Sequence, residues 1–143
     1  MILFNEDKVT KLFSEILQAL QLLEDLRKLS LDSFIAEPHK ISSAKYNLIV
    51  AIECVIDLCN HIISKNNFRA PEDYADTFKI IAEKGLINEE FASSLIKMAR
   101  FRNRLVHIYW DVETTEIYNI LQNYLVDIYK FLDVYKAIIY GGK

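Results

Sequence analysis

The stretch SSAKYNLIVAIECVIDLCNHIISK, residues 42–65, decides the fold. Its apolar side chains occupy almost every side of a helical wheel, so a helix formed by this segment must be surrounded by other helices. Apolar residues elsewhere in the chain recur at steps of three and four, which is the period of an amphipathic helix. Strand-like alternation is not seen. The sequence therefore predicts an all-α, up-and-down bundle of about five helices.

Residues with special backbone preferences mark the ends of these helices. Pro38 indicates a turn or a first helical position, and Pro71, followed by two acidic residues, indicates the start of another helix. Gly85 is predicted to end that helix, and Asn88 to cap the next one. The five predicted helices span residues 6–29, 42–65, Pro71 to about Gly85, Asn88 to about 109, and 116–139.

Composition is typical of one compact helical domain spanning residues 1–143. The chain is 52% hydrophobic and 26% charged, with only 3 Gly and 2 Pro, which favours long uninterrupted helices. Its net charge of −3 is not typical of a nucleic-acid-binding domain. A local basic patch can nevertheless bind an anion on an acidic protein, so charge alone excludes neither possibility.

The remaining signals indicate a cytoplasmic protein without a metal, a cofactor or a membrane partner. Cys54 and Cys59 lie in the same apolar run and are predicted to be reduced core residues. The three histidines show none of the spacings that favour a zinc site. We also expect no signal peptide, and no apolar stretch long enough to cross a bilayer.

A second stretch, ARFRNRLVHIYWDVE at residues 99–113, concentrates charged and titratable groups beside apolar ones. On a helical wheel, Arg102, Asn103, His107 and Tyr109 form one polar crescent next to the core. The segment 97–107 carries four basic residues and one histidine but no carboxylate. This pattern favours an anionic ligand such as a phosphodiester. A solvated helix end whose basic residues favour the helix dipole remains an equally simple alternative.

The same stretch resembles the signature of HEPN domains, helical ribonucleases marked by an arginine followed four to six residues later by a histidine. Arg102, His107 and Tyr109 match the Arg-x4-His-x-Tyr pattern of the HepT toxins of HEPN–MNT toxin–antitoxin pairs. Arg100 stands where that family often has a small residue. The resemblance covers about residues 45–135, and three upstream blocks carry it in order and spacing: residues 51–63, 69–78 and 83–103.

This resemblance implies a homodimeric helical bundle whose two RNA sites meet across a cleft. It implies a metal-independent endoribonuclease that acts on cellular RNA, either tRNA or mRNA. It also implies a partner, the minimal nucleotidyltransferase (MNT) antitoxin, which neutralises the toxin by adding AMP to the tyrosine of the motif, here Tyr109.

The chemistry of the individual residues agrees with these roles. The imidazole of His107 suits general acid or base catalysis at cytosolic pH, and Arg102 offers a permanently charged fork for phosphate oxygens. Asn103 is a candidate to hold either the phosphate or the imidazole. Glu53 and Asp57, four residues apart, are candidates to orient Arg102, although each could equally be a solvated carboxylate. Three further basic residues are predicted to bind RNA: Lys97, Arg100 and Arg104.

Two other classes of function stay open at this point. The protein could be a non-catalytic substrate-binding or scaffold subunit of a minimal nucleotidyltransferase, in which the basic crescent holds a nucleotide without cutting RNA. It could also be a plain dimerising bundle whose polar patch is an interface. The ribonuclease interpretation is favoured because a binding subunit needs no histidine beside the arginine.

Overall fold

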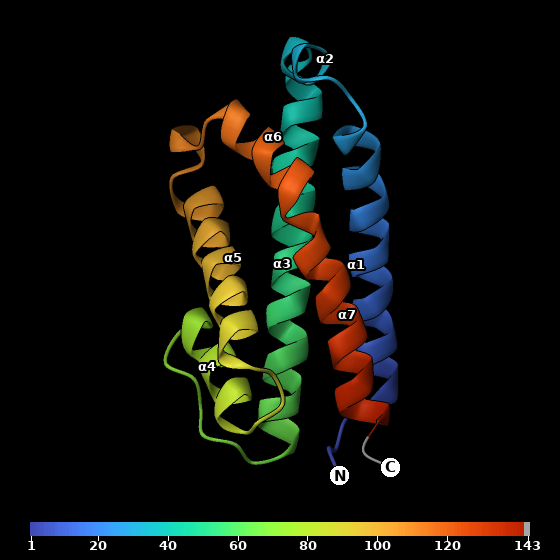
Figure 1. Ribbon diagram of the computed structural model, residues 1–143, viewed down its shortest axis with the longest axis vertical. Helices are drawn as coiled ribbons and strands as arrows, with labels where there is room; N and C mark the ends of the chain where they lie inside the picture. The colour runs from blue at the N-terminus through green and yellow to red at the C-terminus, as the bar shows by residue number, and fades with distance from the viewer. Residues whose placement is uncertain (142–143) are drawn as a thin grey trace.

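The structure, a computed structural model, describes residues 1–141 (Figure 1). Within that range the chain forms α-helices joined by short connections, with a single 3-10 turn, η1, before the last two helices. The elements are α1 (Glu6–Arg27), α2 (Leu31–Ala36), α3 (Pro38–Lys65), α4 (Tyr74–Glu83), α5 (Glu89–His107), η1 (Tyr109–Asp111), α6 (Thr114–Asn123) and α7 (Leu125–Tyr140).

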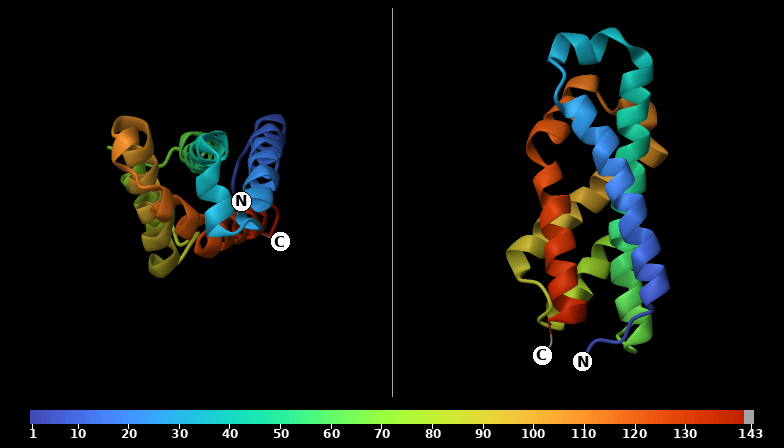
Figure 2. Two further views of the ribbon diagram at one scale, coloured as in Figure 1. Left: turned by 90° about the horizontal axis from the view of Figure 1, so that it is seen from above. Right: turned by 90° about the vertical axis from the view of Figure 1, so that its right-hand side faces the viewer.

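Helix α3 is the centre of the bundle, as its all-round apolar pattern predicts. It lies between α1 and α5, while α7 crosses in front of it (Figures 1 and 2). Its fully buried side chains include Leu48, Ile52, Ile56 and Leu58. Contrary to expectation, α3 is long and apolar enough to cross a membrane, with a mean hydropathy of 1.5, but 67% of that window is buried inside the bundle. This burial is typical of the core helix of a globular domain.

The all-helical fold is confirmed, but the predicted number of five helices is wrong. Residues 1–141 contain seven α-helices, because a short helix precedes α3 and the last predicted helix is divided. The short helix α2 is capped by the Ser30 side chain and anchored by Phe34, which is fully buried. The division falls at Tyr124, whose backbone leaves helical geometry (φ −120°, ψ −4°). Neither glycine nor proline marks this site, so the periodic pattern runs through it.

Most predicted helix ends are confirmed. Pro38 occupies the first turn of α3, the Asn88 side chain accepts a 2.7 Å hydrogen bond from the Phe91 N–H at the start of α5, and Gly85 follows α4 with a φ of +74°. That left-handed conformation favours glycine. The start predicted at Pro71 is wrong, because α4 begins three residues later with Asp73 as its cap.

The two cysteines are free and buried, as predicted. Burial, together with a contact to the Glu15 carboxylate, raises the pKa of the Cys54 thiol to about 12, and burial also raises the pKa of Cys59. Neither thiol therefore has appreciable thiolate character at neutral pH.

Candidate functional site

Arg102 lies on the side of α5 that faces α3, and three groups hold its guanidinium. Its Nε and Nη2 donate to the same oxygen of Glu53, Oε2, at 3.0 and 2.5 Å. Its Nη1 donates to Asn103 Oδ1 at 3.1 Å, and the Tyr74 ring lies 5.0 Å from Cζ. The Arg102 side chain is only 13% exposed. A partly buried guanidinium with these partners has a fixed orientation.

Of the two carboxylates considered as partners of Arg102, only Glu53 is bonded to it. Asp57 lies one turn further along α3, where it lines a polar pocket with Lys8 and His61. Partial burial and the nearby charge of Glu53 raise the pKa of the Asp57 carboxyl. The structure therefore brings Arg102, Glu53 and Asn103 together and leaves Asp57 outside this cluster.

His107 is the last residue of α5, and its side chain is exposed. It lies five positions after Arg102, which corresponds to about 7.5 Å along the helix axis. Apolar side chains beside it are also exposed, notably Trp110 at 82%, together with Val106 and Ile108. The imidazole in this position is accessible from solvent. It lies about 140° around the helix from Arg102, so a ligand that contacts both groups would have to extend around the end of α5.

Tyr109 does not lie on the motif helix, contrary to the wheel that placed it in one crescent with Arg102. Helix α5 ends at His107, and Tyr109 begins the separate turn η1. A residue of α3 that the sequence analysis missed, Lys45, holds it there. The Lys45 ammonium donates to the Tyr109 carbonyl oxygen at 3.3 Å and lies 3.9 Å from the centroid of its ring.

Two residues of the site, Lys45 and Tyr74, were not identified from the sequence. Tyr74 is the first residue of α4, and nothing in its local sequence distinguishes it from the other tyrosines. Lys45 carried a usable signal, because a lysine inside the most apolar helix of a bundle is rarely buried without a partner.

The other basic residues of α5 lie on a different side of the helix. Arg104 and Arg100 are each two residues from Arg102, which is about 200° around the wheel. Together with Lys97 they line a cavity of about 380 Å³ between α5, α6 and α7. Arg104 is bonded there to both oxygens of Glu116, at 2.6 and 3.0 Å. The structure therefore does not bring these three residues together with Arg102.

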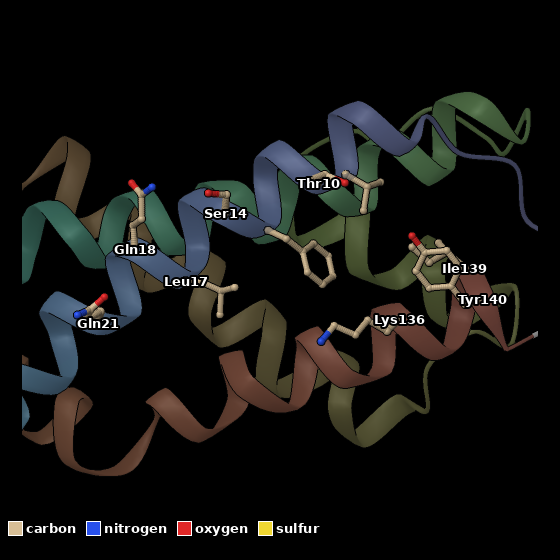
Figure 3. A pocket seen from close by; sticks show the side chains of 10 residues that line it. Thr10, Ser14, Leu17, Gln18, Gln21, Lys136, Ile139 and Tyr140 are labelled. Atoms are coloured by element: carbon tan, nitrogen blue, oxygen red, sulfur yellow. The ribbon is translucent and has the colours of Figure 1, made fainter.

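Figure 3 shows a second groove, of about 490 Å³, between α1 and α7. Phe13, Leu17, Lys136 and Tyr140 line it, and it shares no residue with the Arg102 cluster. Among residues 1–141, no group of three or more His, Cys, Asp or Glu side chains is arranged to hold a metal ion.

Comparison with known proteins places the chain in a family. The family model described as "Ribonuclease HepT-like" matches residues 16–135. The mRNA nuclease HepT of Shewanella oneidensis is 33% identical over 91 residues, which cover 64% of this chain and 68% of that protein. A solved structure of a tri-AMPylated Shewanella oneidensis HEPN toxin in complex with MNT antitoxin is 26% identical, with a TM-score of 0.84 over 92% of this chain and 98% of that one. A toxin–antitoxin structure with AMP-PNP is 25% identical, with a TM-score of 0.85 and the same coverage. The chain belongs to the HepT-like ribonuclease family.

Proposed function

We propose that this protein is the toxin of an HEPN–MNT toxin–antitoxin pair, a cytoplasmic, metal-independent endoribonuclease that cuts cellular RNA, either tRNA or mRNA. The observation that carries the proposal is the Arg102 guanidinium, held by Glu53 one and a half turns from the exposed His107. The names of the relatives support it, since one is an mRNA nuclease and another a HEPN toxin in complex with MNT antitoxin.

The proposed reaction is an internal transesterification of RNA. The 2′-oxygen attacks the neighbouring phosphorus, the bond from phosphorus to the 5′-oxygen breaks, and a 2′,3′-cyclic phosphate is formed. Arg102 would bind the non-bridging oxygens as negative charge develops on them, and Asn103 would hold the phosphate or the imidazole. His107 would either accept the 2′-hydroxyl proton or donate a proton to the leaving 5′-oxygen.

Each turnover needs one group that accepts a proton and one that donates a proton. His107 is the one imidazole on the α5 and η1 segment, whereas His61 is buried elsewhere and accepts a hydrogen bond from the Asn5 N–H. A homodimer that faces two copies of the site would supply both groups. The exposed Val106, Ile108 and Trp110 support an interface at this place, because contiguous exposed apolar side chains mark contact surfaces.

The antitoxin would silence the enzyme through Tyr109. AMP on this hydroxyl would add phosphate beside Arg102 and His107 and occupy the site that RNA needs. Lys97, Arg100 and Arg104 would bind the RNA backbone beyond the cut. Because these three residues lie on a different side of α5 from Arg102, an RNA strand that contacts all four would have to pass over that helix.

The test is cleavage of total tRNA and of a model mRNA in excess EDTA, using protein expressed without its antitoxin. We expect products with the wild type and a loss of about 10²–10⁴-fold in rate with His107→Ala, because the proton-transfer group is removed. Arg102→Ala should abolish cleavage as well. No cleavage by a folded, unmodified dimer would contradict the proposal and favour the non-catalytic subunit of a nucleotidyltransferase.

A further inference from the structure

Lys45 is an unusual lysine. Its residue is only 8% exposed, and among residues 1–141 no carboxylate lies within ion-pair distance of its ammonium. Its one hydrogen bond in that range goes to the Tyr109 carbonyl oxygen. Burying an ammonium is costly unless other groups compensate it. Because no carboxylate neutralises the Lys45 ammonium within the described residues, its positive charge is available to an anionic ligand.

Lys45 holds Tyr109 at two points. The hydrogen bond ties the main chain of η1 to α3, and the cation–π contact orients the phenol ring. No side chain caps η1, so Lys45 fastens the turn to α3 together with Val112, which follows η1 and is buried in the core. Tyr109 nevertheless stays 42% exposed, and its hydroxyl makes no hydrogen bond within the described part of the chain. The ring is thus fixed while the residue remains accessible.

We propose that Lys45 is a positioning residue for the nucleotidylation of Tyr109, and that its ammonium pairs with the phosphodiester that this reaction creates. The inference rests on the proposed function, in which Tyr109 is the modified residue. The Tyr109 oxygen attacks the α-phosphorus of a nucleoside triphosphate, pyrophosphate leaves as the bond to the α-phosphorus breaks, and the phenolic proton passes to solvent. A neutral hydroxyl thereby becomes an anionic phosphodiester.

The position of Lys45 matches this change of charge. Its ammonium already lies against the ring that carries the new anion, and two of its three N–H donors are not used by the Tyr109 carbonyl. A charge-assisted hydrogen bond to phosphate oxygen is stronger than a cation–π contact. Lys45 would therefore present the tyrosine before transfer and bind the product afterwards.

The experiment measures the initial rate of AMP incorporation into the full-length toxin by purified MNT antitoxin and ATP, using intact-protein mass spectrometry. Lys45→Met keeps the length of the side chain and removes its charge, so the rate should fall roughly tenfold. Lys45→Arg keeps the charge and should restore the rate to within about threefold of wild type. Lys65→Met, at the exposed end of the same helix, is the matched control and should be unchanged.

A wild-type rate for Lys45→Met would overturn the inference, and so would a Lys45→Arg protein as slow as the Met variant, because shape alone would then matter. Lys45→Gln is a second neutral variant that keeps the test decisive if the Met variant unfolds. Tyr109→Phe separates this inference from the proposed function. If that protein is still modified at the wild-type rate, the assignment of Tyr109 fails, whereas loss of modification with a normal Lys45→Met rate refutes only the role of Lys45.

Discussion

Two arginines of this protein are bonded to carboxylates in different ways. Arg69, in the connection before α4, donates to both oxygens of Asp76 at 2.7 and 2.9 Å and to both oxygens of Glu83 at 2.8 and 3.1 Å. Arg102 donates to a single oxygen of Glu53 and to the neutral side chain of Asn103. Arg69 is 44% exposed and Arg102 only 13%.

The difference separates a structural ion pair from a candidate binding group. Two carboxylates more than neutralise Arg69, so its cluster repels a further anion and serves to fasten a loop to α4. One carboxylate only balances Arg102, and three hydrogen bonds leave two of the five N–H donors of its guanidinium uncommitted. A rigid guanidinium with free donors can bind a phosphate without reorganising.

The largest expected difference in cleavage rate is between the two proteins in which one of these arginines is replaced by lysine. Arg102→Lys keeps the charge but loses the planar fork, so RNA cleavage should fall about 100-fold. Arg69→Lys should leave the cleavage rate within about twofold, because Arg69 itself contacts only Asp76 and Glu83 and a lysine there keeps the positive charge between them. Single-turnover cleavage of one labelled RNA by both proteins measures the contrast. Equal losses in the two variants would remove the distinction between the arginines.

The next effect concerns the carboxylate that orients Arg102. Glu53→Gln keeps the shape of the side chain but weakens its hold on the guanidinium, and we expect cleavage to slow about tenfold with little change in melting temperature. Asp57→Asn is the matched control one turn away on α3, and it should retain the wild-type rate. A greater loss with Asp57→Asn than with Glu53→Gln would show that the partner of Arg102 has been misassigned.

The choice between Glu53 and Asp57 also shows how far the sequence could lead. Periodicity identified α3 as the core, and the motif identified Arg102 and His107 as candidates. Both carboxylates are four residues apart on one helix, so only the register between α3 and α5 could decide which of them meets Arg102. That register depends on packing between segments 49 residues apart and leaves no local signal.

The missed features have the same physical origin. Lys45 contacts a residue 64 positions away, and Tyr74 reaches Arg102 from a separate helix. The end of α5 at His107 and the break at Tyr124 are marked by neither glycine nor proline, so the apolar pattern continued through both. Tertiary packing, rather than local propensity, therefore determines the position of Tyr109.

The smallest expected effect is on the melting temperature, and its pH dependence tests whether the Arg69 ion pairs stabilise the fold. The hydrogen bonds from Arg69, and then the one from the Glu72 N–H, lower the pKa of Asp76 from 3.8 to about 2. Because the pKa is lower in the folded state, the stabilisation is fully present above pH 4 and is lost as the pH falls through 2. Asp76→Asn should therefore melt about 2–4 °C below wild type at pH 6. The gap should close towards pH 2, as followed by circular dichroism.

Arg102→Lys provides the contrast in the same melting series. We expect this substitution to lower the cleavage rate rather than the stability. The difference between its melting temperature and that of the wild type should therefore stay constant between pH 6 and pH 2. A gap for Asp76→Asn that stays constant down to pH 2 would mean that the carboxylate charge does not stabilise the loop. In that case the saturated Arg69 cluster would not be the structural counterpart of Arg102, and only the difference in catalysis would still distinguish the two arginines.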